Sequence, residues 1–333
     1  MKHLGLLLTE RCNAHCRHCI ISHFVSEGRD MALTDAQRYI NEFAEITIPG
    51  SPFTVHFSGG EVFLRFTDLL TVTRHAKEKG ASSVVCVTNG AWGEKSELAR
   101  QQAKELKSAR MNRVNFSLDD FHQEYIPLGS VVNSISACLE AGLDIGIKCT
   151  VTRNSQKLHN IIANLKDLLL NIPFQAEEWA YVPSLNDKQI PKQEWLIPKS
   201  LPQEHCPELI LTILPDGTAF PCCGAGWTPR LILGNARSES IASLIQKAQY
   251  GHVFGVMRDK GPAFFIPYFN QSEESLPTEG YVSTCHLCMT VLNHSACDKI
   301  LPTALADWKI ERIKNALGGL WNPNITVSIP SKG

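Results

Sequence analysis

Short apolar and β-branched runs alternate with amphipathic stretches through the first 183 residues, and this alternation limits the folds open to the chain. Helical periodicity is expected over 67–79, 95–109, 131–141 and 159–170, and over 34–46, where Thr34 and Gln37 form a potential capping box. The six predicted strands are His3 to Leu8, Thr54 to Phe57, Ser83 to Val87, Arg113 to Leu118, Asp144 to Val151 and Trp179 to Val182. Such strand–helix units predict an α/β fold with parallel strands, whose chemistry lies in the loops after the strands' carboxyl ends.

The pattern changes after Pro183. Residues 185–205 are rich in Pro, Lys and Gln, which predicts a linker. The stretch "ELILTILPDGTAFPCC" then predicts a β-hairpin that turns at Asp216-Gly217 and ends at two cysteines. A helix is expected at Ser240 to Gln249, and another in "ALADWKIERIKNALGGLW". We therefore expect four parts, which are a core over 1–184, the linker over 185–205, a small second unit over 206–300, and a terminal helix and tail over 301–333.

Composition excludes several classes of protein. The 32 Lys and Arg nearly balance the 33 Asp and Glu, so no basic surface for nucleic acid or for an anionic membrane is expected. The apolar runs are too short to span a bilayer or to form a signal peptide, which predicts a cytoplasmic protein. In such a compartment the 12 cysteines of the chain indicate metal or redox chemistry rather than disulfides.

Cys12, Cys16 and Cys19 follow the first predicted strand with the spacing CxxxCxxC. Short cysteine spacings also suit tetrahedral zinc, but zinc motifs generally supply cysteines in CxxC pairs. A 4Fe-4S cluster that is held by three thiolates keeps one iron without a protein ligand, and that iron is open to a small molecule. The spacing favours such a cluster, and zinc is the alternative.

On these residues the sequence resembles the radical SAM superfamily over about 1–183. The resemblance implies a partial (β/α)6 barrel of TIM-like type, in which the CxxxCxxC loop holds a cluster that binds S-adenosyl-L-methionine (SAM). "FSGGEVFLR" supplies Gly59, Gly60 and Glu61 after the second strand and looks like the family's GGE motif, which receives the SAM amino group. Glycines permit a close backbone approach, and a carboxylate is a natural partner for an ammonium group.

Further SAM contacts are implied by the same resemblance. Thr88 and Asn89 would face the sulfonium region, Ser117 and Asp119 would bind the ribose hydroxyls, and Arg153 would pair with the SAM carboxylate. The alternatives are an ordinary turn at Asn89, a helix cap at Asp119 and a surface position for Arg153. The family's chemistry begins with one electron from an external flavodoxin- or ferredoxin-type reductant, and it cleaves SAM to a 5′-deoxyadenosyl radical.

The second unit carries another set of cysteines. The hairpin end and the later CxxC resemble the twitch domain, a short relative of SPASM domains built on a β-hairpin and a helix, which implies one auxiliary 4Fe-4S cluster. The implied ligands are Cys206, Cys222, Cys285 and Cys288. A structural zinc ribbon is the alternative, and the sequence leaves open whether Cys297 is a ligand. Cys86, Cys138 and Cys149 fall within strand or helix patterns and are expected to be buried apolar residues.

Cys223 directly follows Cys222 in the Pro-Cys-Cys element. Adjacent side chains of an extended strand point to opposite faces, so Cys223 is expected to face away from a cluster that Cys222 binds. The surrounding sequence resembles YydG-type radical SAM peptide epimerases, which implies that Cys223 is a catalytic hydrogen-atom donor. A packed thiol or an alternative cluster ligand are the other possibilities for this residue.

The resulting hypothesis is an enzyme that epimerises L- to D-residues in a ribosomally made peptide. An oxidative radical SAM enzyme is the alternative, and it would cross-link a peptide or dehydrogenate a small alcohol with the auxiliary cluster as electron acceptor. A non-catalytic zinc-binding regulator is a third possibility. Because the chain begins at the first strand, we expect no separate leader-peptide domain before it, and the peptide would dock on the core.

Overall fold

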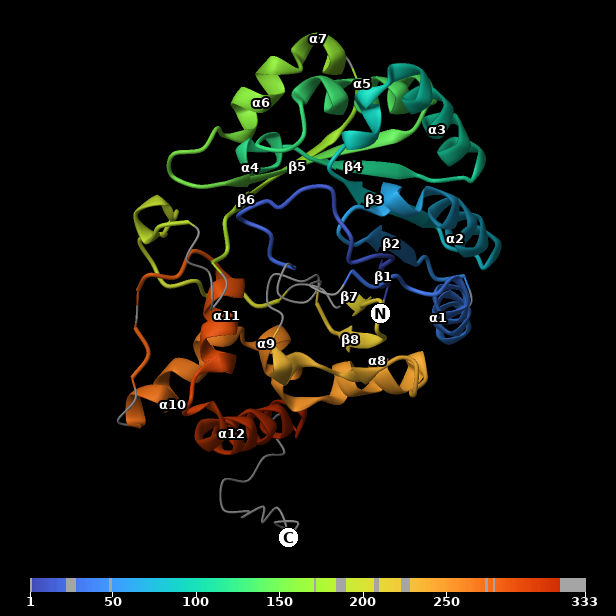
Figure 1. Cartoon of the computed structure of the whole chain (residues 1–333). Helices are drawn as coiled ribbons and strands as arrows, with labels where there is room; N and C mark the ends of the chain where they lie inside the picture. Colours follow the sequence, from blue (N-terminus) through green and yellow to red (C-terminus); the bar gives the residue numbers. More distant parts are fainter. Residues whose placement is uncertain are drawn as a thin grey trace.

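The computed structural model describes residues 2–21, 28–47, 50–170, 172–183, 190–206, 210–222, 228–272, 275–277 and 279–317. Six parallel strands form an arc, as the alternating pattern predicts (Figure 1). They are β1 (His3–Leu7), β2 (Thr54–Ser58), β3 (Ser83–Thr88), β4 (Arg113–Ser117), β5 (Asp144–Val151) and β6 (Gln175–Ala180). The expected α/β fold with a partial barrel is thus confirmed, although the sixth strand begins four residues earlier than predicted.

Helices cover the outer face of this arc (Figure 1). They are α1 (Leu33–Ile46), α2 (Phe66–Glu78), α3 (Ser96–Ser108), α4 (Asp120–Gln123), α5 (Leu128–Glu140), α6 (Leu158–Asn164) and α7 (Lys166–Leu169). The predicted capping box is wrong, because Ala36 N–H already donates to Ala32 O (3.0 Å), which makes Ala32 the N-cap and places Thr34 inside the first turn. The single helix expected over 159–170 is divided into α6 and α7.

Strand alternation separates a dry face from a polar face of the sheet. Leu4, Val55 and Val84 are matched across β1, β2 and β3 and are fully buried. The next residues along these strands point the other way. On that inner face His56 Nε2 lies 2.9 Å from His3 Nδ1. The apolar face packs under the helices, so the polar face is the one that turns inward.

The predicted hairpin is confirmed, and it extends the same sheet. β7 (Ile210–Ile213) pairs in parallel with β1, and β8 (Thr218–Phe220) and β9 (Gly234–Asn235) follow, so the strand order is β6-β5-β4-β3-β2-β1-β7-β8-β9. The turn contains Gly217 at φ +90°, a backbone conformation that favours glycine. The second unit is therefore joined to the core through the backbone of β1.

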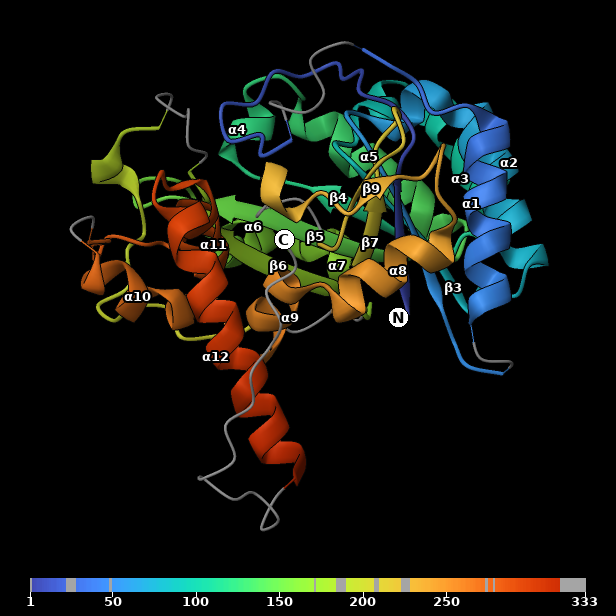
Figure 2. The ribbon, with the colours of Figure 1, turned by 90° about the horizontal axis from the view of Figure 1, so that it is seen from below.

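The remaining helices form a second hydrophobic cluster beside the hairpin. They are α8 (Ile241–Tyr250), α9 (His252–Asp259), α10 (Ile266–Gln271), α11 (Thr284–Asn293) and α12 (Cys297–Leu317). Short 3-10 helices lie at Val62–Arg65, Ala91–Glu94, Lys192–Glu194, Pro229–Leu231 and Pro262–Phe265. α12 extends away from the rest of the molecule (Figure 2) and crosses the boundary predicted between residues 300 and 301. The four-part division remains a prediction.

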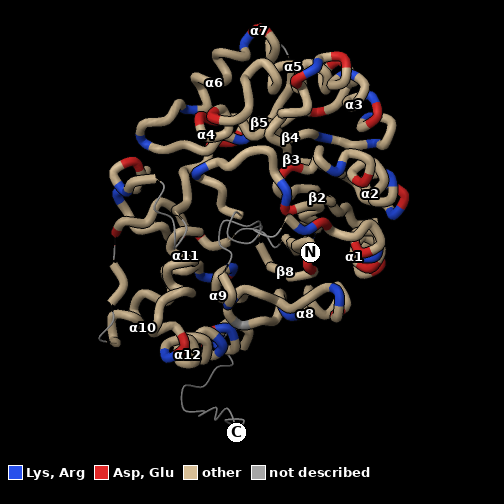
Figure 3. Tube along the Cα trace, in the orientation of Figure 1, with Lys and Arg blue, Asp and Glu red and all other residues tan. Residues whose placement is uncertain are grey.

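Charges of both signs are interspersed along α2, α3 and α12 (Figure 3). Among the described residues, no helix is both long enough and apolar enough to cross a membrane.

Candidate active site

The three N-terminal cysteines lie in the loop that leaves the carboxyl end of β1, and each is half-buried. Cys19 N–H donates to Cys16 O (3.1 Å), which closes a turn between them. Burial raises the pKa of Cys12, and Glu61 and Cys19 add to this effect. Burial, Asp119 and the other two thiols raise the pKa of Cys16 to about 12. Mutual repulsion of three nearby thiolates is relieved by a cation, so this donor set fits a thiolate-bound iron cluster.

The two motif glycines are required by the backbone of this cysteine loop. Gly60 N–H donates to Thr9 O (2.8 Å), and the next residue's N–H donates to Arg11 O (2.8 Å). A Cβ atom at Gly60 would lie 2.2 Å from Arg11 O, and one at Gly59 would lie 2.4 Å from Thr9 O. The glycines therefore let the segment after β2 press against the residues that precede Cys12.

Glu61 is buried, and its carboxylate joins the ends of two strands. It accepts hydrogen bonds from Phe63 N–H (3.0 Å), from Thr88 Oγ1–H (2.8 Å) and from Asn89 N–H (2.7 Å). Burial raises the pKa of Glu61 despite these three donors. The side chain thus holds the backbone after β3 in place, and its predicted contact with the SAM amino group remains a prediction.

Asn89 connects the end of β3 to the cysteine loop. Its Nδ2 donates to Asn13 Oδ1 (2.7 Å) and lies 4.0 Å from Cys12 Sγ. Its Oδ1 accepts from Ala91 N–H (3.0 Å), which fixes the amide orientation. The structure therefore brings Thr88 and Asn89 together with Glu61 and the loop of Cys12.

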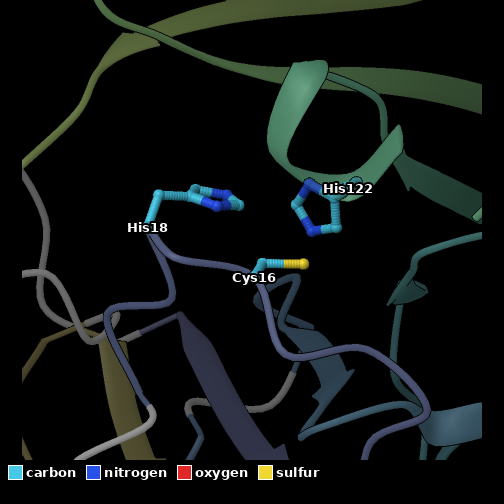
Figure 4. A group of neighbouring side chains, drawn as sticks. All are labelled: Cys16, His18 and His122. Carbon is cyan, nitrogen blue, oxygen red and sulfur yellow. The ribbon is translucent and has the colours of Figure 1, made fainter. Parts of the chain in front are cut away.

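Asp119, His122, His18 and Cys16 lie together in a group that the sequence did not predict. Asp119 and His18 are buried, whereas Cys16 and His122 are half-buried. A ring nitrogen of each histidine and Cys16 Sγ all lie within 4.8 Å of one another (Figure 4). Asp119 Oδ1 accepts from His122 N–H (3.0 Å) and lies 2.9 Å from His122 Nδ1, while Oδ2 accepts from Thr150 N–H (3.1 Å). Asp119 is therefore the cap of α4, and its predicted ribose contact remains a prediction.

His18 occupies the centre of this group. Its ring stacks on Phe121 at 4.8 Å between centroids, and its Nε2 lies 3.7 Å from Asp119 Oδ2. Its Nδ1 is buried and has no hydrogen-bond partner among the residues that the structure describes. Burial lowers the pKa of His18 to about 4, although Asp119 opposes that effect. One indication in the sequence that His18 belongs to the site is its position between the predicted ligands Cys16 and Cys19.

Residues at the α4 segment also contact the exposed side of the loop that carries Cys16 and Cys19. Arg17 Nη2 pairs with Glu124 Oε1 (2.6 Å), and its guanidinium lies over the Phe121 ring at 5.5 Å. The segment between Cys16 and Cys19 is thus fixed by stacking and by an ion pair.

Ser117 and Arg153 lie near the carboxyl ends of β4 and β5. Ser117 is the last residue of β4 and is half-buried. The side chain of Arg153 is exposed, and its backbone N–H donates to Glu194 O (2.7 Å). The predicted SAM contacts of both residues remain predictions.

The second set of cysteines gathers at the amino end of α11. Cys285 and Cys288 lie one turn apart there, where the helix dipole favours anionic ligands. Cys206 N–H donates to Met257 O (3.0 Å), and Met257 Sδ lies 3.8 Å from Cys288 Sγ. Burial raises the pKa of Cys288, and Cys285 and Cys206 add to this effect. These thiols, with Cys222 packed on the same hydrophobic cluster, fit a second iron–sulfur cluster.

The two sets of cysteines attach to β1 and to the hairpin at different points. Cys206 precedes β7 and Cys222 follows β8, so both lie at the open end of the hairpin. In register, Ile210 at that end is matched to His3, the first residue of β1. The N-terminal loop leaves the other end of β1, five residues further on, which corresponds to about 16 Å of strand. Cys223 lies outside the described residues.

Four further cysteines are buried. Cys86, Cys138 and Cys149 are at most 1% exposed, which confirms their predicted place in the core. Cys297 is the first residue of α12 and is also 1% exposed. It is followed by Asp298, which pairs with Arg230 (2.9 Å).

Two family models match the chain. Residues 6–153 match the radical SAM superfamily, and residues 205–289 match SPASM, an iron-sulfur cluster-binding domain. The chain is therefore a radical SAM enzyme with a SPASM-like C-terminal domain. Its cofactors are SAM, a 4Fe-4S cluster in the core and an auxiliary iron–sulfur cluster in the C-terminal domain.

Two curated relatives and one solved structure match most of the length of this chain. The chain is 24% identical over 303 residues to the "Putative peptide biosynthesis protein YydG" of Bacillus subtilis, covering 88% of this chain and 92% of that protein. It is 28% identical over 300 residues to a GTP 3′,8-cyclase of Limosilactobacillus fermentum, covering 85% and 78%. A solved structure named "Native anSMEcpe with bound AdoMet" superimposes with a TM-score of 0.57 at 14% identity, over 96% of this chain and 100% of that one. This last likeness shows a shared fold.

Proposed function

We propose that the enzyme modifies a ribosomally made peptide by inverting the Cα stereocentre of a residue, with Cys223 as the hydrogen-atom donor. Support for a peptide comes from the YydG relative, whose name refers to peptide biosynthesis. Support for inversion comes from one observation, which is that the loop of Cys12, Cys16 and Cys19 follows the last residue of β1, whereas Cys222 follows β8 in the hairpin whose first strand pairs with β1. A substrate held between them can lose a hydrogen atom on one side and receive one from the other.

Cys12, Cys16 and Cys19 would hold the SAM-binding cluster, and Cys206, Cys222, Cys285 and Cys288 would hold the auxiliary one. When bound, the first cluster and SAM supply a 5′-deoxyadenosyl radical after uptake of one electron from a flavodoxin- or ferredoxin-type reductant.

The residues of this chain orient the groups around that radical. Glu61 and Asn89 fix the backbone beside Cys12, and the family resemblance further assigns Gly59, Gly60, Thr88, Ser117, Asp119 and Arg153 to SAM. Once the radical that SAM would supply has removed the Cα hydrogen atom, the Cys223 S–H would donate a hydrogen atom to the opposite face of Cα. One electron and one proton restore the Cys223 thiol, and the peptide keeps its original composition.

The test is turnover of the short peptide encoded beside the enzyme's gene, with SAM and a reductant, in heavy water. Inversion predicts an unchanged peptide mass in ordinary water, one added deuterium per event in heavy water, and a D-residue after hydrolysis. Cys223→Ala should stop inversion while 5′-deoxyadenosine is still released. Cys138→Ala, which removes a buried thiol of the core, is the matched control and should retain inversion.

Two other outcomes would replace this proposal. A peptide that loses two hydrogen atoms, with Cys223→Ala still active, would establish the oxidative enzyme, in which the auxiliary cluster accepts the electron. The GTP 3′,8-cyclase relative makes a nucleotide the other candidate substrate. Conversion of GTP, with no change in the peptide, would establish that function.

A further inference from the structure

Among the described residues, β6 is the edge strand of the sheet, and its carboxyl end lies on the same side as the active-site loops. It pairs with β5 from Gly146↔Gln175 to Val151↔Ala180, and it stands first in the strand order. Within the part of the chain that the structure describes, β6 makes backbone hydrogen bonds to β5 and to no other element. In Figure 1 the arc of strands ends at β6 on one side and at the β7–β8 hairpin on the other, with α9 and α11 across the opening.

The direction of the free groups follows from the strand's own alternation. Tyr181, the residue after β6, donates its N–H to Val151 O of β5 (2.9 Å). Because N–H and C=O directions alternate along a strand, the backbone groups of Ala176, Glu178 and Ala180 point away from β5. These three residues therefore offer a row of donors and acceptors that matches another extended backbone.

The side chains of β6 leave this edge accessible. Ala176 and Glu178 are exposed, and Trp179 is 57% exposed. The Trp179 ring is oriented by its Nε1–H, which donates to Glu177 Oε2 (3.2 Å), and that carboxylate pairs with Lys148 (2.7 Å). Edge strands are usually protected by Pro, by charged side chains, especially Lys, or by a bulge. β6 has two Glu but neither a Pro nor a Lys, and it presents an oriented aromatic ring.

The edge leads directly to the cysteine loop. Tyr181 is 2% exposed and packs with Phe121 and Ile190 in a small cluster that also contacts Cys16. A segment lying along β6 would therefore reach the same end of the barrel as the loop of Cys16. The hairpin that carries Cys222 lies on the other side of the opening.

We propose that β6 binds the substrate peptide by strand addition, so that an extended segment pairs with Ala176, Glu178 and Ala180 and places an apolar side chain against Trp179. Backbone pairing supplies affinity for peptides in general, and the ring supplies side-chain preference. This inference rests on the proposed function in taking the substrate to be a peptide.

Hydrogen exchange of the full-length holoenzyme tests the edge directly, with the synthetic peptide encoded beside the gene as the probe. Fragmentation of the protein during mass spectrometry resolves single amides. Peptide binding should slow exchange at Ala176, Glu178 and Ala180, whereas the N–H groups of Gln175, Glu177 and Trp179 already bond to β5 and should change little.

Two variants test the same edge by fluorescence anisotropy of the labelled peptide. Ala176→Pro removes one outward N–H and keeps the pairing with β5, and it should raise the Kd about tenfold. Ala176→Ser keeps that N–H and is its matched control. Trp179→Ala should weaken binding by a similar factor, and Tyr250→Ala, which removes a 72% exposed aromatic residue of α8, should not. Iron content and the thermal midpoint show that each variant is folded.

The outcomes separate this inference from the proposed function. If the peptide is epimerised without slowed exchange at Ala176, Glu178 and Ala180, the proposed binding to β6 is wrong and the proposed function is unaffected. If the peptide protects these amides and is not modified, the proposed binding to β6 is supported and the proposed function is contradicted.

Discussion

Single residues of the site differ in how far the sequence revealed them. The position of Cys12, Cys16 and Cys19 in one loop after β1 could be predicted because their spacing is local, and their role as ligands remains a prediction. Asp119 and His122 could not be placed beside Cys16 in advance, because that contact joins α4 to the loop after β1. The contact of Glu61 with SAM remains a prediction, and the structure adds that its carboxylate holds the backbone after β3.

The substitution Glu61→Gln tests whether the Glu61 carboxylate holds the backbone after β3. The glutamine side chain has the same shape as glutamate, but it has one oxygen in place of two. Its NH2 group would face donors, because the Glu61 carboxylate accepts from three of them, so one or two hydrogen bonds are lost. We expect a loss of about 1–3 kcal/mol in the free energy of unfolding and weaker SAM binding. Glu97→Gln, at a side chain that is 93% exposed, is the control for both measurements. Equal stability of the two variants would contradict the role.

His56 should make the protein sensitive to mild acid. Burial, with smaller effects from His3 and Lys148, lowers its pKa from 6.5 to about 4. Between these values the unfolded chain binds a proton that the folded chain does not, so stability is complete above pH 6.5 and declines as the pH falls toward 4. The loss is on the order of 3 kcal/mol.

Urea denaturation of His56→Asn from pH 7 to pH 4 measures this effect. The variant should lose less stability over that interval than the parent protein does. His159→Asn, at an exposed residue of α6, should follow the parent curve. A parent-like slope in His56→Asn would show that burial of this ring does not set the pH dependence.

At the scale of elements, periodicity and turn chemistry predicted most strands and helices within a few residues. The hairpin turn at Asp216-Gly217 was recognisable because Thr218 N–H bonds to Asp216 Oδ1 (2.9 Å), a local interaction. The start of α1 was misplaced, since Ala32 lacks a capping side chain and leaves no signal. β6 was also misplaced, because its exposed faces lack the apolar alternation of a buried strand.

Replacement of Gly60 should displace the whole segment after β2. In Gly60→Ala the new Cβ would lie 2.2 Å from Arg11 O, and a backbone atom cannot move aside as a side chain does. We expect displacement of the cysteine loop and loss of one cluster, so that iron falls from about eight to about four per chain. Gly129→Ala, where a Cβ meets no atom within 4 Å, should keep all the iron.

α11 and α12 carry cysteines with different expected roles. Cys288→Ala should remove the auxiliary cluster, because Cys288 lies with Cys285 and Cys206 at the amino end of α11. Cys297→Ala should retain it, since Cys297 is packed in the hydrophobic cluster beside Asp298. Iron and sulfide analysis of anaerobically purified protein distinguishes them. Loss of iron from Cys297→Ala would make Cys297 a ligand.

At the scale of the whole molecule, the sheet unites the core and the C-terminal unit. The sequence predicted both parts but not their connection, because the partner of β7 depends on contacts about 200 residues apart, between His3 and Ile210. That pairing joins the hairpin that ends at Cys222 to the strand that precedes the loop of Cys12, Cys16 and Cys19. The proposed inversion requires a substrate to lie between the two sets of cysteines.

The central claim is that Cys12, Cys16 and Cys19 leave one iron of their cluster open for SAM. The most direct measurement is the electron paramagnetic resonance spectrum of the reduced, fully iron-loaded enzyme before and after addition of SAM, together with assay of 5′-deoxyadenosine. We predict that SAM changes the spectrum and that 5′-deoxyadenosine is released. An unchanged spectrum without release of 5′-deoxyadenosine would contradict the account.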